Sequence, residues 1–162
     1  MDEVSGIFKL LVKYVASELE ELNSNNVQVH ILGDWSGIPD DAQDSVRRAI
    51  ETTHDNTGMV FSIAINYGGR AEIIRACNQI ISEGLESVSE EEFEKRLYTA
   101  SYPDPDVIIR TGGEYRLSNF LTWQSAYSEL VVDDTYWPDF TPEKYERALE
   151  EYQGRSRRFG GL

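Results

Sequence analysis

The sequence predicts an α/β protein in which helices flank a parallel β-sheet. Short apolar runs typical of strands alternate with amphipathic segments typical of helices, and this alternation favours parallel strands joined by helical crossovers. The 162 residues contain no repeat, linker or low-complexity tract that would separate two domains. A chain of this length suits one hydrophobic core, so we expect a single domain over residues 1–162.

Four short apolar runs are predicted to be strands, because each is rich in β-branched residues and bounded by turn residues. They lie at residues 27–32, 59–66, 106–109 and 130–132. Arg110 follows the third run directly, at its carboxyl end, and a Thr-Gly-Gly turn comes next. Because open parallel sheets bind ligands at the carboxyl ends of their strands, this turn is a candidate for a binding site.

The segments between these runs carry helix signals. Residues 3–23 place apolar side chains three and four positions apart on one face, and a helix over 39–54 has a proline near its first turn. Ser89 and Glu92 form a capping box that begins a short acidic helix, and Thr141 begins the last helix. A helix is also expected after the Asn-Tyr-Gly-Gly turn that follows the second strand. Helical spacing predicts a buried face formed by Phe120, Trp123, Ala126 and Tyr127, and it places Tyr145, Leu149 and Tyr152 on one face of the last helix.

The composition excludes several classes of function. Hydrophobic residues make up 40% of the chain and aromatic residues 11%, as in globular proteins. The formal net charge is −14, from 15 basic and 29 acidic residues, which argues against nucleic acid or an anionic membrane as a partner. No apolar run approaches about 18 residues and no signal peptide is recognised, so we expect a cytoplasmic protein.

Residues 104–129, with the sequence DPDVIIRTGGEYRLSNFLTWQSAYSE, are typical of a phosphate-binding turn. Two glycines that let the backbone approach an anion lie between Arg110 and Arg116. Two guanidinium groups and the Ser118 hydroxyl are donors that suit a diphosphate. Surface salt bridges are the alternative, but they do not explain why both arginines flank the Gly-Gly turn.

Four segments of the chain resemble cis-prenyltransferases, and in particular the undecaprenyl diphosphate synthases and their relatives. They are NYGGRAEI at 66–73, the segment at 104–129, TYWPDF at 135–140 and RSRRFGG at 155–161. The resemblance implies chain elongation, in which an allylic diphosphate ionises with the assistance of Mg²⁺ and condenses with isopentenyl diphosphate. It also implies peripheral contact with a membrane through the lipid product.

The resemblance implies roles for residues of the 104–129 segment. Arg110, Arg116 and Ser118 match the positions that hold the diphosphate of isopentenyl diphosphate. Glu129 matches a glutamate that helps to hold the catalytic Mg²⁺, although by residue type alone it is a solvated or capping carboxylate. Tyr115 departs from the histidine common in bacterial members, which bears on the inner coordination of the metal.

Further substrate-binding residues are implied outside the two arginines. Asn66 and Arg70 match residues at the border of the active-site cleft, and Asn119 matches part of its polar floor. Arg158 and Gly160 match an Arg-x-Gly element that crosses the dimer and completes the diphosphate site of the neighbouring subunit. A basic tail that offsets a helix dipole is the alternative for this terminus.

Two family motifs do not occur in this sequence. They are the Asp-Gly-Asn-x-Arg-Trp loop, which carries the catalytic aspartate, and the Ser-x-Glu-Asn-Trp segment that follows it. We therefore assign no catalytic residue, and we expect the single domain to correspond to the carboxyl-terminal two-thirds of a family member. A partner chain is expected to supply the loop, in a hetero-oligomer or a homodimer-like assembly, and an exposed sheet edge is expected here. Two alternatives stay open, a non-catalytic accessory subunit and a fragment of a homodimeric synthase.

Overall fold

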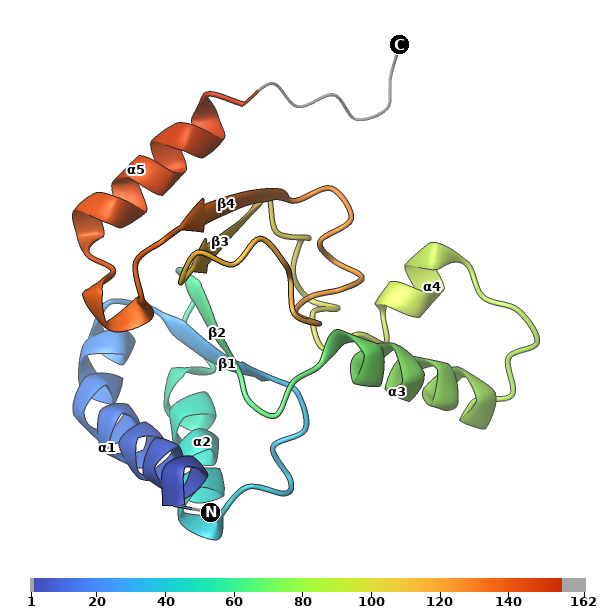
Figure 1. Ribbon diagram of the computed structural model, residues 1–162. Helices are drawn as coiled ribbons and strands as arrows, with labels where there is room; N and C mark the ends of the chain where they lie inside the picture. The colour runs from blue at the N-terminus through green and yellow to red at the C-terminus, as the bar shows by residue number, and fades with distance from the viewer. Residues whose placement is uncertain (1, 156–162) are drawn as a thin grey trace. The chain divides into compact units, whose positions relative to one another are not determined.

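Two pairs of parallel strands, each with its own helices, form the part of the chain that the computed structural model describes, residues 2–155 (Figure 1). The chain divides into two units, Met1–Tyr67 and Gly68–Leu162. The α/β class and the parallel pairing of the strands are confirmed. The single domain expected from the sequence stays a prediction.

The first unit contains four elements in βαβ order after an initial helix. They are α1 (Asp2–Ser24), β1 (Gln28–Leu32), α2 (Asp40–Thr53) and β2 (Val60–Ala64). Strand β1 pairs with β2 in parallel, from Gln28 opposite Val60 to Leu32 opposite Ala64. Each of these elements was predicted from the sequence, to within one or two residues at most ends.

The core of this unit lies between its helices and β1. One cluster of buried side chains contains Ile38, Ala42, Val46 and Ile65, and a second contains Leu19, Val29 and Ala49. The fully buried Thr53 hydroxyl accepts a hydrogen bond from the Val29 N–H at 2.9 Å and donates one to the Ala49 carbonyl at 2.8 Å. This hydroxyl therefore ties the end of α2 to β1 without leaving a buried polar group unpaired.

Strand β2 is exposed although it is apolar. Val60 is 38% exposed and Phe61 is 43% exposed, and the preceding Met59 is 64% exposed. Within the residues that the structure describes, β2 pairs with β1 alone. A strand that is apolar on both faces is typical of the interior of a parallel sheet, so β2 has the composition of a central strand at an open edge.

The second unit begins with two helices, continues with a strand pair and ends with a helix. Its elements are α3 (Gly69–Ser82), α4 (Glu90–Glu94), β3 (Val107–Thr111), β4 (Glu129–Asp133), the 3₁₀ turn η1 (Trp137–Asp139) and α5 (Pro142–Gln153). Strand β3 pairs with β4 in parallel, from Val107 opposite Glu129 to Thr111 opposite Asp133. Helix α5 packs on β4, and the rings of Phe93 and Trp123 contact each other in a tilted arrangement with centroids 4.5 Å apart.

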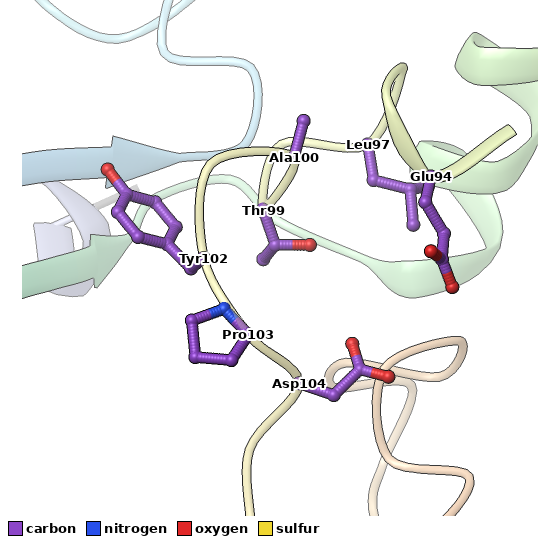
Figure 2. A pocket seen from close by; sticks show the side chains of 7 residues that line it. All are labelled: Glu94, Leu97, Thr99, Ala100, Tyr102, Pro103 and Asp104. Atoms are coloured by element: carbon purple, nitrogen blue, oxygen red, sulfur yellow. The ribbon is translucent and has the colours of Figure 1, made fainter. Parts of the chain in front are cut away.

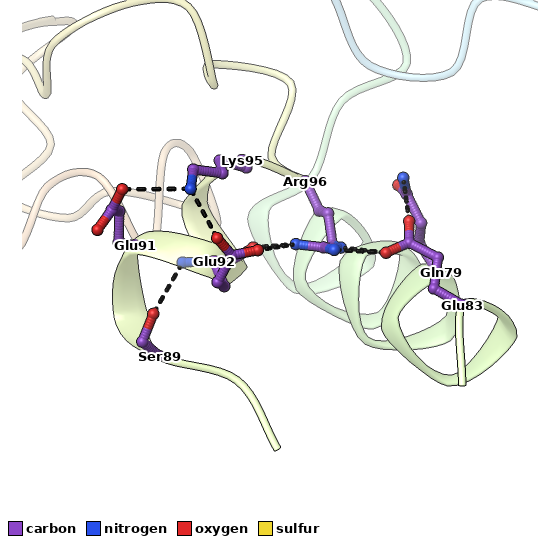
Figure 3. A network of polar contacts seen from close by, with 7 residues as sticks. All are labelled: Gln79, Glu83, Ser89, Glu91, Glu92, Lys95 and Arg96. Atoms are coloured by element: carbon purple, nitrogen blue, oxygen red, sulfur yellow. Dashed lines mark hydrogen bonds and ion pairs between the residues drawn. The ribbon is translucent and has the colours of Figure 1, made fainter. Parts of the chain in front are cut away.

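Ion pairs join α4 to the end of α3 (Figure 3). Ser89 is the N-cap of α4, as the predicted capping box requires, because its Oγ accepts a hydrogen bond from the Glu92 N–H at 3.2 Å. The Arg96 guanidinium bridges the helices, with Nε donating to Glu83 Oε2 at 3.0 Å and Nη1 lying 3.3 Å from Glu92 Oε2. Hydrogen bonds from Arg96 lower the pKa of Glu83, and those from Lys95 and Arg96 lower the pKa of Glu92.

The helix predicted to bury Phe120, Trp123, Ala126 and Tyr127 on one face is wrong. Residues 117–127 form successive turns, because positive φ angles at Asn119 and Leu121 (66° and 43°) are incompatible with a right-handed helix. Tyr127 is accordingly 70% exposed. In α5, Leu149 and Tyr152 are partly buried and Tyr145 is half exposed, and Ala148 is the buried residue of the helix.

Candidate functional site

The two arginines of the predicted phosphate turn line one cavity in the second unit. The cavity has a volume of about 270 Å³, and we call it the arginine cavity. Its lining residues are Ile108, Ile109, Arg110, Thr111, Arg116, Leu117, Phe120 and Leu130. Guanidinium groups and aliphatic side chains therefore meet in one small space, which suits a ligand with an anionic head and a hydrocarbon part.

Arg110 points into this cavity because of its position in β3. It lies inside the strand, opposite Val132, rather than beyond the strand end as the sequence predicted. Side chains alternate between the faces of a sheet, so Ile108, Arg110 and Leu130 share one face. Arg110 Nε is buried and has no hydrogen-bond partner in the described part of the chain, and an orphaned buried donor of this kind favours binding of an anion.

Arg116 lies at the opposite side of the turn and is more accessible. Its side chain is 64% exposed, and Nη1 forms an ion pair with Glu114 Oε2 at 2.5 Å. This exposed pair is worth little in water, so an incoming diphosphate competes with Glu114 at small cost. The alternative given in the sequence analysis, a surface salt bridge, therefore describes Arg116. Arg110 forms no such ion pair within the described residues.

The Gly-Gly turn has a structural use that the sequence did not reveal. Gly112 and Gly113 have φ angles of +86° and +71°, which favour glycine. Their N–H groups donate to the Thr135 and Asp133 carbonyls at 2.8 and 3.0 Å. The turn is therefore bonded to the last residue of β4 and to the segment that follows it, and a close approach of its backbone to an anion stays a prediction.

Asn119 joins the phosphate turn to the start of α3. Its backbone carbonyl accepts a hydrogen bond from the Gly69 N–H at 2.8 Å, and its Oδ1 accepts one from the Arg70 N–H at 2.9 Å. A second cavity of about 310 Å³ is lined by Arg70, Leu117, Asn119 and Thr122. Since Leu117 lines both cavities, Arg70 and Asn119 lie next to the arginine cavity. Ser118, which precedes Asn119, is exposed and has a φ of +50°.

Asn66 belongs to the first unit. It has a φ of 47°, and its Nδ2 donates to the Asp34 carbonyl at 2.8 Å. Hydrogen bonds from the hydroxyl and N–H of Ser36 lower the pKa of Asp34. Asn66 therefore ties together the carboxyl ends of β1 and β2.

Glu129, the predicted metal ligand, faces away from Arg110. It lies at the start of β4 opposite Val107, so it is about 10 Å along the strand from the level of Arg110 and on the other face of the sheet. Arg155 Nη1 donates to Glu129 Oε2 at 2.9 Å and also pairs with Glu151 through Nη2; Glu129 and Glu151 together raise the pKa of Arg155.

The described residues do not form a site for Mg²⁺. Among them, no group of three or more His, Cys, Asp or Glu side chains could hold a metal ion. The Glu129 carboxylate is already neutralised by Arg155, whereas Mg²⁺ prefers oxygen ligands that are free to bind it. A role for Glu129 in metal binding therefore stays a prediction, and no step below depends on the metal.

The remaining predicted residues contribute no geometry to this site. Arg158 and Gly160 lie outside the described residues, and Tyr115 is 80% exposed. Figure 2 shows another cavity, of about 230 Å³, lined by Glu94, Leu97, Thr99, Ala100, Tyr102, Pro103 and Asp104. Burial raises the pKa of Asp104, and nearby Glu94 and Glu90 raise it further. Two carboxylates and no cation make this cavity unsuitable for a diphosphate.

Two buried polar residues near the site were not singled out from the sequence. Glu72 and Gln124 are each 1% exposed and are hydrogen-bonded to each other. Glutamate is common in the first turn of a helix, so Glu72 is not distinctive in the sequence. Gln124 lies among aromatic residues whose spacing predicted a hydrophobic face. Their separation of 52 positions in the sequence carries no signal of contact.

Comparisons with known proteins agree with the motifs described above. The protein family described as "Putative undecaprenyl diphosphate synthase" matches residues 1–160. An isoprenyl transferase of Clostridium perfringens is 45% identical over 167 residues, which cover 99% of this chain and 66% of that protein. An isoprenyl transferase of Fusobacterium nucleatum is 45% identical over 161 residues, which cover 99% of this chain and 70% of that protein. The chain thus spans about two-thirds of the length of these relatives.

Two solved structures are similar to this one. Lavandulyl diphosphate synthase from Lavandula x intermedia, in complex with dimethylallyl diphosphate, has a TM-score of 0.94 at 32% identity, over 99% of this chain and 72% of that chain. A probable undecaprenyl diphosphate synthase from Campylobacter jejuni has a TM-score of 0.88 at 34% identity, over 99% of this chain and 76% of that chain. None of the helices in residues 2–155 combines the length and the apolar character that crossing a membrane requires.

Proposed function

The chain belongs to the undecaprenyl diphosphate synthase family, and on that premise we propose that it is the isopentenyl diphosphate-binding part of a cis-prenyltransferase. One observation carries the proposal. The buried Nε of Arg110 has no hydrogen-bond partner among residues 2–155 and belongs to a cavity that Arg116 also lines, so two positive groups are available to one diphosphate. The aliphatic side chains of the same cavity form an apolar surface that suits the short hydrocarbon of isopentenyl diphosphate.

The residues of this chain act by positioning and by charge. Arg110 holds the diphosphate from within the sheet, Arg116 exchanges Glu114 for a phosphate oxygen, and the Ser118 hydroxyl donates a further hydrogen bond. The C–O bond of the allylic diphosphate breaks and pyrophosphate leaves, the isopentenyl double bond forms a bond to the allylic carbon, and loss of a proton from the isopentenyl unit gives the cis product. Such a reaction depends on orientation and fixed charge, because the bound substrate must meet the allylic carbon in one geometry.

The allylic half of the reaction is proposed to come from a partner chain in a hetero-oligomer or a homodimer-like assembly. That chain would carry the catalytic aspartate. The assembled enzyme would be cytoplasmic and would contact the membrane peripherally through its lipid product. Strand β2 supports this proposal, because its exposed Val60 and Phe61 would be covered by a further strand paired at its open edge.

A non-catalytic accessory subunit is the second candidate. The ion pair between Glu129 and Arg155 favours it, since it occupies the carboxylate for which the resemblance implies metal binding. In that case the chain would stabilise a catalytic partner, and its own arginines would be dispensable for turnover.

Incorporation of labelled isopentenyl diphosphate into lipid tests both candidates. The chain would be assayed with farnesyl diphosphate and Mg²⁺, alone and mixed with a co-encoded chain that carries the Asp-Gly-Asn motif. Activity of the mixture that Arg110→Ala abolishes supports the first candidate, and activity that Arg110→Ala leaves unchanged supports the accessory role. Arg48→Ala, which removes an exposed arginine from the first unit, is the matched control.

A further inference from the structure

A buried polar network links the first turn of α3 to the segment that follows the arginine cavity. Glu72 and Gln124, each 1% exposed, are the two largest fully buried side chains of the described residues. Glu72 Oε1 accepts a hydrogen bond from the Tyr98 N–H at 2.6 Å, and Glu72 Oε2 accepts one from Gln124 Nε2 at 3.1 Å. Gln124 Nε2 also donates to Thr99 Oγ1 at 2.9 Å.

This network is not part of the binding surface itself. Neither Glu72 nor Gln124 lines the arginine cavity. Burying a carboxylate is unfavourable unless donors and local dipoles compensate, as the two hydrogen bonds and the start of α3 do here. A buried charge that binds no ligand needs another explanation, and the adjacent loop provides one.

Residues 117–122, which we call the strained loop, have an unfavourable backbone conformation. Ser118, Asn119 and Leu121 have φ angles of 50°, 66° and 43°. Asparagine tolerates this region, but serine and especially leucine adopt it at a cost in free energy. Such a conformation persists only where the surrounding structure holds it in place.

The strained loop is attached to α3 on both sides. Within the loop, the carbonyl and Oδ1 of Asn119 accept hydrogen bonds from the Gly69 and Arg70 N–H groups, respectively. After its end, Gln124 is bonded to Glu72, two residues beyond Arg70 in the same turn of α3. The loop is therefore held between two attachments to the first turn of one helix.

We propose that Glu72 and Gln124 are positioning residues that hold the strained loop in place and so set Ser118 and Asn119 beside the arginine cavity. The inference rests on the proposed function, because it gives the loop its purpose as part of a diphosphate site. Glu72 and Gln124 touch no ligand, and their contribution to affinity is preorganisation of the groups that do.

Exchanging the two side chains tests the pairing. In Glu72→Gln, the single side-chain oxygen accepts from the Tyr98 N–H, so the new NH₂ group faces that of Gln124. In Gln124→Glu, two buried carboxylates face each other. In the double exchange, donor and acceptor are complementary again, the net charge equals that of the native chain, and the Thr99 hydroxyl donates to the carboxylate at position 124.

Amide hydrogen exchange of residues 117–122 reports on the loop, and calorimetric titration with isopentenyl diphosphate reports on the site. We expect Glu72→Gln and Gln124→Glu each to speed amide hydrogen exchange in the loop roughly tenfold. Each should also raise the dissociation constant for isopentenyl diphosphate roughly tenfold. The double exchange should recover both to within about threefold. Glu86→Gln, which removes an exposed carboxylate from the same unit, should change neither.

The proposal is overturned if amide hydrogen exchange in the loop is unchanged in both single variants. It is also overturned if the double variant recovers neither the slow hydrogen exchange nor the affinity. If the native chain does not bind isopentenyl diphosphate, the proposed function fails, yet the hydrogen exchange still decides the inference. Should Glu72→Gln not fold, Thr99→Val removes a single acceptor from the same network. Faster exchange confined to the loop then supports the inference, and faster exchange throughout the second unit contradicts it.

Discussion

Replacing Arg110 with methionine should strengthen the fold and weaken ligand binding at the same time. Arg110 Nε is a buried donor without a partner in the described residues, and such a group costs about 1–3 kcal/mol in the ligand-free protein. Methionine keeps most of the apolar stem that packs with Ile108 and Leu130 in the cavity wall. The free energy of unfolding should therefore rise by about 1 kcal/mol in Arg110→Met.

The affinity for isopentenyl diphosphate should change in the opposite direction. Hydrogen bonds between a guanidinium and a phosphate contribute about 2–3 kcal/mol, so Arg110→Met should raise the dissociation constant roughly 30- to 150-fold. Urea unfolding measures the first quantity and calorimetric titration the second, with Arg48→Met as the control for loss of an exposed arginine. A variant that is less stable, or one that binds as tightly as the native chain, would refute the assignment of Arg110 as a diphosphate ligand.

Three further substitutions test the packing and charge described above. Gly69→Ala should lower the free energy of unfolding by about 1–3 kcal/mol, because its Cβ would lie 2.4 Å from Thr122 Oγ1; thermal unfolding measures this, and an unchanged midpoint would contradict the close approach. Thr53→Val should lower the free energy of unfolding by about 1–3 kcal/mol, because the buried Val29 N–H loses its acceptor. Urea unfolding at neutral pH measures this, and an unchanged free energy of unfolding would contradict the importance of the hydrogen bond. Arg96→Met should remove part of the acid sensitivity of folding. Arg96 lowers the pKa of Glu83, so their interaction stabilises the protein above the usual glutamate pKa and is lost as the pH falls through the lowered value. Stability curves between about pH 6 and about pH 3 should therefore be flatter in the variant, and parallel curves would argue against the pair.

Local signals were sufficient for most elements of the fold. The apolar spacing over 3–23 and the capping box at Ser89 depend on residues within one or two helical turns, and both helices were found where expected. The β-branched runs similarly identified β1 to β4. Helical spacing failed at 117–127, where hydrogen bonds from the start of α3 to Asn119 stabilise a loop that local preferences disfavour.

The candidate site was predictable in its residue types and less so in its geometry. Arg110 and Arg116 flank a glycine turn, and this pattern was enough to predict a shared anion site. The orientation of Glu129 depends on the register of β3 against β4, since a shift of one residue moves a side chain to the other face of a sheet. The same register places Arg110 beside Ile108 and Leu130, where its Nε has no acceptor in the described part of the chain.

The sequence alone determined the class of fold, the order of the elements and the family, because these follow from short-range periodicity and from motifs that are contiguous in the chain. Only the tertiary structure decided how these residues are used. It placed the guanidinium of Arg110 in a cavity, paired Glu129 with Arg155 on the opposite face of β4, and buried Glu72 against Gln124. Each of these outcomes depends on contacts between residues more than 20 positions apart, or on the pairing of two strands, and neither leaves a pattern in the local sequence.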